Sequence, residues 1–412
     1  MKKIIKAKLL IDGTGSKPLN DPVIVIDNGI IESINTGNGF THQEDLEVID
    51  ALGKTVLPGL IDGHIHLAWG RQNQPGWSQA VGDEAKILLW ATRGAQSLLL
   101  DGITTARDCG GPGRVTFLLR DAINTGMIQG PRLFVAGPVL TTTAGHCHFF
   151  GIESNNAYQL REGVRKLVQQ GSDFIKIMAT GGATTPISNR WRAQYSISEL
   201  TAAVEDAHRL GKQVVVHGNG TEGIRNAVEA SVDTVAHCCW FGTEEGTIEF
   251  DEKVVEKMAD KDIYVDFNIP GAFVPLSTSN RSIQGLVGET RWDLIKVMQR
   301  SGIKVYLSTD AMGASRGQFT DLLVRMVEEG KVTSSDIIPM VTRIPAQAMG
   351  LGDKVGTVEP GKVADLILLD GNPLEEIGAL KRLDMVLSVG EIRVSQGKLI
   401  YTELSNQFTN LY

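Results

Sequence analysis

Short β-branched runs alternate with longer amphipathic stretches from Thr55 onward, and this alternation limits the possible folds more than any other feature of the chain. The pattern is typical of repeated βα units built around a parallel sheet. Eight such runs, each followed by a stretch with helical periodicity, predict an α/β fold, a closed (β/α)8 TIM-like barrel with its chemistry on the loops after the strands. The predicted strands are Val56–Leu60, Thr104–Asp108, Leu133–Ala136, Phe174–Ala179, Gln213–His217, Thr234–His237, Ile263–Phe267 and Lys304–Ser308.

The two ends of the chain depart from this pattern. Residues 1–54 and 355–412 are rich in short alternating strands and in tight turns such as Asp27-Asn28-Gly29 and Glu359-Pro360-Gly361. We expect these ends to pair as one small, discontinuous β-sandwich domain. The barrel of residues 55–354 is then inserted into it.

The charge and the cysteine content exclude several classes of function. A net charge of −8 provides no basic stripe for a nucleic-acid backbone. No segment is apolar for long enough to span a bilayer, and the opening residues lack the apolar core of a signal peptide. The four cysteines, none of them in a CxxC pair, fit a reduced compartment. We therefore expect a cytoplasmic homo-oligomer that acts on a small molecule, without nucleic-acid or membrane partners.

Histidines mark the ends of several predicted strands, where a barrel keeps its active site. His64 and His66 are one residue apart in an extended segment, so the period of two points both rings to the same side. His217 ends the run QVVVH, His237 ends TVAH and Asp310 ends KVYLSTD. A single histidine at a strand end is more often a packing residue than a ligand. Four of them with an aspartate predict a metal site at the barrel mouth.

Lys176 lies inside FIKIMA, an otherwise apolar strand, where a free ammonium is costly to bury. An ordinary buried ion pair would compensate this charge. Alternatively, the lysine side chain could extend to the barrel mouth, where the ammonium stays solvated. The functional alternative is carbamylation by carbon dioxide, which converts the cation into a carboxylate able to bridge two metal ions. The position of Lys176 between the two pairs of histidines suits such a bridge.

Five motifs, in the order PGLIDGHIHL, FIKIMATGG, VVVHGNG, VDTVAH and LSTDA, resemble the successive metal motifs of the amidohydrolase superfamily. VGTVEPGKVADLILLD near the C-terminus resembles the strand pair that completes the small domain of that family. The resemblance covers nearly the whole chain and implies two divalent metal ions, zinc by expectation, with a bridging water. It implies one ion held by His64, His66, Lys176 and Asp310, and a second held by Lys176, His217 and His237.

Two further motifs are similar to one branch of the superfamily, which contains prolidase-like Xaa-Arg dipeptidases, imidazolonepropionase-like proteins and ochratoxin-type amide hydrolases. GITTARDCGG, with Asp108, resembles the second-strand motif of this branch, and TTAGHCHFFG resembles its substrate-contacting loop, with His146 at the expected histidine. Two segments depart from the pattern. ISNRWRAQYS brings Arg190 and Arg192 where acidic residues are common, and AHCCWF replaces an EHG-like run.

The implied reaction is hydrolysis of a C–N amide bond. Two divalent ions lower the pKa of a shared water from about 15.7 towards neutrality, which generates hydroxide. Asp310 would accept the proton of this water and return it to the leaving nitrogen, and His146 would stabilise the oxyanion. Hydrolysis of a cyclic amide or imidazolone, or of an aryl urea or carbamate, is the alternative. A mononuclear deaminase, which has no ligand at the position of Lys176, and a catalytically silent relative are disfavoured.

Aromatic and basic residues in the predicted mouth loops point to the substrate. Large aromatic surfaces there favour a bulky hydrophobic group, and two arginines after the lysine strand form a candidate fork for a carboxylate. We therefore expect an N-acyl amino acid or dipeptide-like substrate. The expected contacts are Trp69, Trp191, Trp240, Arg190, Arg192 and His146, with Trp77 in a further mouth loop. His42 and His208 are expected to be ordinary surface residues, His148 is left open, and Cys147, Cys238 and Cys239 are expected in the pocket wall.

Overall fold

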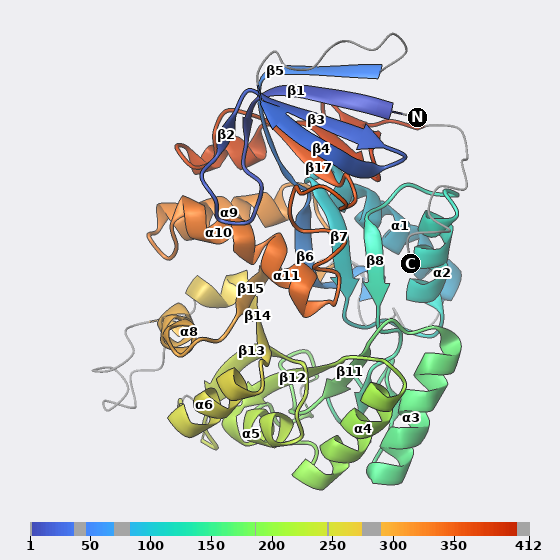
Figure 1. The fold of residues 1–412 in the computed structure, drawn as a ribbon. Helices are drawn as coiled ribbons and strands as arrows, with labels where there is room; N and C mark the ends of the chain where they lie inside the picture. Colours follow the sequence, from blue (N-terminus) through green and yellow to red (C-terminus); the bar gives the residue numbers. More distant parts are fainter. Residues whose placement is uncertain are drawn as a thin grey trace.

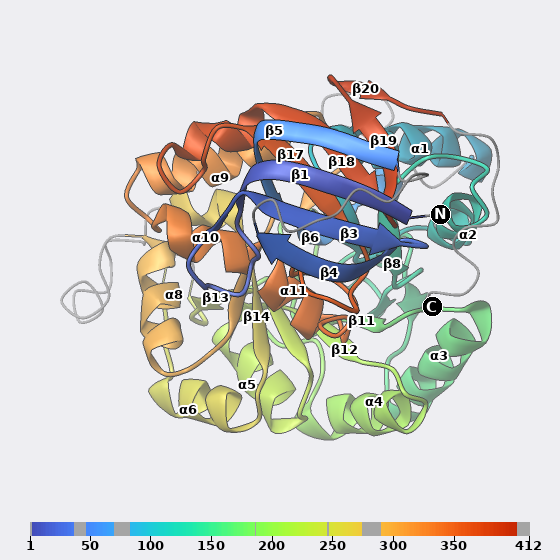
Figure 2. The same ribbon diagram turned by 45° about the horizontal axis from the view of Figure 1, so that its top comes forward.

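The computed structural model describes residues 2–36, 47–69, 83–185, 187–244, 247–273 and 290–401. Its centre is a set of parallel strands surrounded by helices, and the two chain ends form a separate sheet against one side of this set (Figures 1 and 2). The central parallel strands are β6 (Leu60–His66), β7 (Ile103–Asp108), β8 (Arg132–Val135), β11 (Ile175–Met178), β12 (Val214–Gly220), β13 (Thr234–Phe241), β14 (Tyr264–Asn268) and β15 (Val305–Ser308).

The parallel strands are hydrogen-bonded in chain order within two groups, β6 to β8 and β11 to β15. Two seams connect these groups. At one, the Asp173 amide donates to the Val135 carbonyl at 2.9 Å, and at the other the Asp310 amide donates to the His64 carbonyl at 2.9 Å. Beside the second seam, the short β16 (Ala311–Met312) pairs in parallel with β6. The arrangement is TIM-barrel-like, with parallel sheets and mixed α/β content.

The first predicted strand, Val56–Leu60, is placed wrongly. Residues 56–58 belong to β5 (Glu47–Pro58), which pairs with strands of the end sheet, and the first central strand begins only at Leu60. The run TVLPGLID is apolar across both strands, so periodicity does not show where one ends. The break lies at Gly59, where a Cβ would come within 2.0 Å of the Thr104 hydroxyl.

Helices cover the outside of the parallel strands. In α3, for example, Leu160, Gly163, Val164 and Leu167 are buried, which is the spacing of one apolar helix face. A capping box between Ser196 and Glu199 fixes the start of α4. The helices are α1 (Glu84–Leu100), α2 (Val115–Asn124), α3 (Ala157–Gln170), α4 (Ile197–Arg209), α5 (Thr221–Glu229), α6 (Glu252–Asp260), α8 (Arg291–Arg300), α9 (Gln318–Glu328), α10 (Ser334–Met340) and α11 (Arg343–Ala348).

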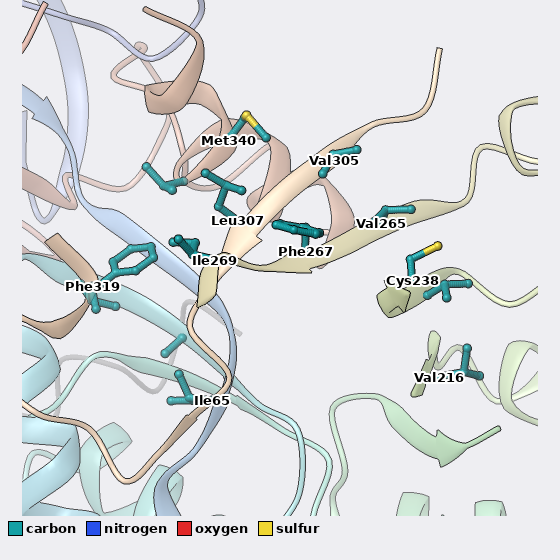
Figure 3. Close-up of a cluster of buried hydrophobic side chains, with 14 of the residues drawn as sticks. Ile65, Val216, Cys238, Val265, Phe267, Ile269, Val305, Leu307, Phe319 and Met340 are labelled. Atoms are coloured by element: carbon teal, nitrogen blue, oxygen red, sulfur yellow. The ribbon is translucent and has the colours of Figure 1, made fainter. Parts of the chain in front are cut away.

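The main hydrophobic core lies between these helices and the parallel strands. Figure 3 shows part of it, where Val265 and Phe267 of β14 lie beside Val305 and Leu307 of β15, and Leu307 lies near Met340 of α10. These side chains are at most 3% exposed. Strands buried on both faces are typical of parallel sheets covered by helices, and they explain the nearly continuous apolar runs of the sequence.

The two chain ends meet in one sheet. Its nine strands follow the order β20-β19-β18-β17-β5-β1-β3-β4, and β2 pairs with β1. A buried ion pair between Arg132 and Asp365 connects β8 to this part of the molecule. The two-layer form of the sandwich stays a prediction. The strands are β1 (Lys2–Leu10), β2 (Leu19–Asn20), β3 (Pro22–Asp27), β4 (Ile30–Thr36), β5, β17 (Leu366–Asp370), β18 (Leu383–Ser388), β19 (Glu391–Ser395) and β20 (Lys398–Leu399).

Short elements complete the described chain: β9 (Leu140–Thr141), β10 (Ile152–Glu153) and the 3-10 turns η2 (Leu67–Trp69), η4 (Ile269–Phe273) and η5 (Ile377–Lys381). None of the helices within the described ranges combines the length and the apolar character needed to cross a membrane.

Candidate functional site

A cavity of about 860 Å³ opens at the carboxyl ends of the parallel strands. Residues at or near the ends of β6, β11, β12, β13, β14 and β15 line it, which is where a fold of this kind places its chemistry. All six residues predicted as metal ligands line this one cavity together with His146: His64, His66, Lys176, His217, His237 and Asp310.

The histidine pair of β6 points into the cavity, as the period of two predicts. The Nε2 atoms of His64 and His66 are 3.3 Å apart. Asp310 Oδ1 lies 3.5 Å from the first of these nitrogens and 3.4 Å from the second. These three ligand atoms lie within 4.8 Å of one another, close enough for one metal ion.

The hydrogen-bond partner of Nδ1 determines which nitrogen of each ring carries the proton. His66 Nδ1 is 3.0 Å from the Gly110 carbonyl oxygen, and His64 Nδ1 is 2.7 Å from Asp266 Oδ2. Because a carbonyl and a carboxylate only accept hydrogen bonds, both Nδ1 atoms carry a proton, and in the neutral rings both Nε2 atoms present lone pairs. Two lone pairs facing each other repel unless a cation lies beside them, so this donor set fits a metal ion.

Asp62 and Asp310 hold the end of β15 against β6. The buried carboxylate of Asp62 accepts from the Thr309 amide at 3.1 Å, from its hydroxyl at 2.6 Å and from the His64 amide at 3.2 Å. Asp310 then adopts a left-handed φ of 54°, a conformation that costs a non-glycine residue free energy. Burial raises the pKa of Asp310, whereas the neighbouring imidazoles, when protonated, lower it by more, to below the usual range.

Lys176 is 1% exposed, and its amine nitrogen lies 3.5 Å from His64 Nε2. Among the residues that the structure describes, no carboxylate lies within ion-pair distance of this nitrogen. An ordinary ion pair therefore does not explain the buried lysine in the described part of the chain. The side chain also ends at the cavity between the two groups of histidines, rather than in open solvent.

His217 and His237 complete the second group. Their ring centroids are 4.4 Å apart, and the His237 ring is 5.2 Å from that of His64. Asn219 Nδ2 lies 2.9 Å from His217 Nε2, and Asn268 Oδ1 is hydrogen-bonded to His237 Nδ1. Burial lowers the pKa of His237 to about 4 and that of His217 well below its usual value. Neutral imidazole is the form that binds metal.

His146 comes from the loop after β9, and its ring centroid lies 4.4 Å from that of His217. Gly182 makes this approach possible, because a Cβ at that position would lie 2.4 Å from the His146 ring. His146 Nδ1 is 3.2 Å from the Thr185 hydroxyl. Burial lowers the pKa of His146 to about 3, so the ring is neutral at neutral pH.

The predicted substrate contacts fall into two groups. Trp69 and Arg190 line the cavity, and the Trp69 ring packs 5.1 Å from that of His66. Arg192 is exposed, and the ring of Trp191 stacks on Arg190. In the described part of the chain, neither Arg192 nor Trp191 lines the cavity. Trp240 is fully buried.

The expectation for Trp240 therefore needs correction. Its indole nitrogen donates to the Met298 sulfur at 3.4 Å, and its ring packs 5.0 Å from that of Phe250. β13 continues past its predicted end to Phe241, but its backbone is irregular there, with left-handed φ at His237, Cys238 and Trp240. His237 and Cys239 line the cavity, whereas Cys238 and Trp240 pack in the core.

The remaining histidines and cysteines are placed as follows. His148 lies 3.9 Å from Glu153 and is not a cavity residue in the described structure, and His208 pairs with Asp233 at 2.8 Å at the surface. Cys147 and Cys239 line the cavity. Cys238 packs in the core instead, and Trp77 and His42 lie outside the described residues.

Sequence reasoning missed Asp266 and Arg291, which also belong to the site. Asp266 in YVDFN is a charged residue inside an apolar strand, the same signal that singled out Lys176, and it could have been found in the same way. Arg291 at the start of α8 lines the cavity but carries no sequence signal, because it begins a surface helix.

The ordered ligand set, the strand lysine and the parallel-strand fold agree with a match to the Amidohydrolase family over residues 55–393. The chain belongs to the amidohydrolase family. The ochratoxinase of Aspergillus niger is 27% identical to it, over 91% of this chain and 82% of the relative. The imidazolonepropionase of Rhizobium rhizogenes is 23% identical, over 86% of this chain and 88% of the relative.

A solved Xaa-Pro dipeptidase with bound methionine is 30% identical, and the alignment covers 95% of this chain and 99% of that one with a TM-score of 0.81. These relatives confirm the branch that GITTARDCGG and TTAGHCHFFG predict, and they support the conclusion that this amidohydrolase is a hydrolytic enzyme.

Proposed function

We propose that this amidohydrolase uses two divalent metal ions, zinc by preference, to hydrolyse a C–N amide bond. The proposed substrate is an N-acyl amino acid or a dipeptide-like molecule with a bulky hydrophobic group. The observation that carries this proposal is the convergence of His64 Nε2, His66 Nε2 and Asp310 Oδ1 within 3.5 Å of one another at the cavity. The similarity to a Xaa-Pro dipeptidase supports a dipeptide-like substrate.

His64, His66 and Asp310 fit one ion, and we propose a second ion beside it. One would be held by the histidine pair, Lys176 and Asp310, and the other by Lys176, His217 and His237. We propose that Lys176 reacts as a neutral amine with carbon dioxide, forming an N–C bond and releasing a proton, so that a carboxylate replaces the unpaired ammonium. When bound, the two cations supply Lewis acidity and lower the pKa of a shared water towards neutrality.

The side chains around this water then move protons and orient the substrate. Asp310, held ionised beside the imidazoles, accepts the proton of the attacking water and returns it to the leaving nitrogen. His146 is neutral and donates an N–H to the carbonyl oxygen as negative charge develops there. Trp69 presents an apolar surface for the hydrophobic group of the substrate.

We propose the finer architecture as well: the eight parallel strands close into a (β/α)8 barrel of residues 55–354, and residues 1–54 and 355–412 form a β-sandwich domain. Closure explains why residues from β6, β11, β12, β13 and the end of β15 reach a single cavity.

The test combines metal analysis with a hydrolysis screen. Two ions per chain and turnover of N-acyl amino acids or dipeptides are expected for the metal-replete protein. One ion per chain with release of ammonia from an aminopurine would indicate a deaminase, and no ion would indicate a silent relative. Preferred turnover of a cyclic amide would favour the imidazolone alternative, for which the imidazolonepropionase relative is the supporting observation.

A further inference from the structure

We propose that Arg190 and Arg291 together bind the carboxylate of the substrate, so that the enzyme selects amides that carry a free carboxylate close to the scissile bond. This inference rests on the proposed amide hydrolysis and deepens it. It replaces the pair Arg190 and Arg192 that the sequence favours, because the structure leaves Arg192 exposed and brings Arg291 to the cavity instead.

Both guanidinium groups lack an anionic partner. Within the described ranges, neither Arg190 nor Arg291 forms an ion pair with a carboxylate, although both line the cavity. The Nε atom of each is buried and has no hydrogen-bond partner among the described residues. Guanidinium groups that line a cavity without a carboxylate partner in the described ranges are suited to bind an anion that enters this cavity.

The two arginines share one aromatic ring. The guanidinium carbon of Arg190 lies 5.4 Å from the centroid of Phe241, and that of Arg291 lies 6.0 Å from the same centroid. Both cations are therefore near one ring, and an anion that contacts both of them would offset their positive charge. The planar fork of each guanidinium matches a carboxylate, which has two acceptor oxygens.

Neighbouring side chains hold each arginine in place. Trp191 stacks on Arg190 with the guanidinium carbon 4.6 Å from its ring centroid, which makes Trp191 a positioning residue rather than a contact of the substrate. The backbone of Trp191 is itself packed against Gly220, where a Cβ would lie 2.5 Å from the Trp191 carbonyl oxygen. Arg291 Nη2 donates to the His237 carbonyl at 3.3 Å.

A chain of contacts connects this pair to the metal-binding residues. Arg291 Nη2 lies 2.7 Å from Cys239 Sγ, which lies 3.1 Å from Asn219 Oδ1, and Asn219 Nδ2 is 2.9 Å from His217 Nε2. The cationic pair is therefore next to the second metal group. A carboxylate one residue away from a scissile amide, as in a dipeptide or an N-acyl amino acid, would meet the arginines while its amide carbonyl faces the metal-binding residues.

The test compares a carboxylate with its neutral counterpart on the metal-loaded, full-length enzyme. The kcat/KM values for N-benzoylphenylalanine and for its primary amide are measured, and calorimetric binding is compared instead if neither is hydrolysed. Wild type is expected to prefer the carboxylate by at least about tenfold, because hydrogen bonds to charged groups contribute about 1.5–3 kcal/mol. Arg190→Gln and Arg291→Gln should each lower this preference about tenfold, Arg190→Lys should restore part of it, and Arg192→Gln should leave it unchanged.

Folding and metal content are checked for every variant. Because Arg291 also contacts the His237 backbone, Arg190→Gln alone is sufficient if Arg291→Gln fails to fold. A carboxylate preference that persists in Arg190→Gln and Arg291→Gln would assign the carboxylate to the metal centre and overturn the proposal. Amide hydrolysis without carboxylate preference would also overturn it and leave the proposed function standing. Carboxylate binding through both arginines without hydrolysis of any amide would leave the anion site standing and refute the proposed function.

Discussion

The substitution Asp266→Asn tests whether the hydrogen-bond partner of a proposed metal ligand, His64, affects metal affinity. Asp266 Oδ2 accepts from His64 Nδ1 at 2.7 Å, and its Oδ1 accepts from the Ser308 hydroxyl at 2.6 Å. An asparagine keeps its shape and one acceptor oxygen for His64, and the Ser308 hydroxyl can turn to accept from the new amide. The change therefore removes the negative charge and little else.

The expected loss follows from this charge. A carboxylate on the distal nitrogen of a ligating histidine raises the basicity of the ring, and losing such a partner weakens metal binding about 10–100-fold. This factor corresponds to about 1.4–2.7 kcal/mol. Arg107 Nη2, only 3.6 Å from Asp266 Oδ2, also loses its nearest buried counter-charge, so we expect reduced stability of the metal-free protein as well.

Metal affinity is measured by competition with a chromophoric chelator, and stability by urea unfolding of the metal-free protein. Asp173→Asn is the matched control, because its carboxylate also pairs with an arginine, Arg120 at 3.0 Å, and accepts from the Val135 amide at 2.8 Å, but within the described residues it hydrogen-bonds no proposed metal ligand. The control should lose stability and keep its metal affinity. Unchanged metal affinity in Asp266→Asn would refute the reasoning, whatever happens to its stability.

Three further variants test the individual roles. Lys176→Ala should lose metal and activity together, and added short-chain carboxylates should restore part of both; a free amine in an active, metal-filled crystal would contradict the carbamate. Asp310→Asn should keep its fold and most of its metal while kcat falls at least about 100-fold, and near-normal turnover would exclude Asp310 as the proton carrier. Trp240→Ala should lower the free energy of unfolding by about 3–5 kcal/mol in urea titrations with KM unchanged, because the ring fills the core. A raised KM at unchanged stability would instead indicate that Trp240 contacts the substrate.

Residues on regular strands were predicted well from the sequence. His64 and His66 point to one side because a strand alternates with a period of two, and the structure brings both to the cavity with His217, His237 and Asp310. The order of the strands along the chain was predictable because each βα unit is local. Where periodicity was interrupted, prediction failed, as at Pro58 and Gly59, where one apolar run serves two sheets.

The sequence by itself determined the repeated βα units, the candidate metal ligands and the anomaly of a lysine on an apolar strand, since each of these depends on local spacing and residue chemistry. Only the tertiary structure decided which loop and helix residues face the cavity. A loop has no regular period that fixes the direction of a side chain. In helix α8, the packing of the helix against the rest of the molecule decides that Arg291 faces the cavity. Arg291 therefore joins Arg190 from a distant segment while Arg192, two residues from Arg190, stays exposed.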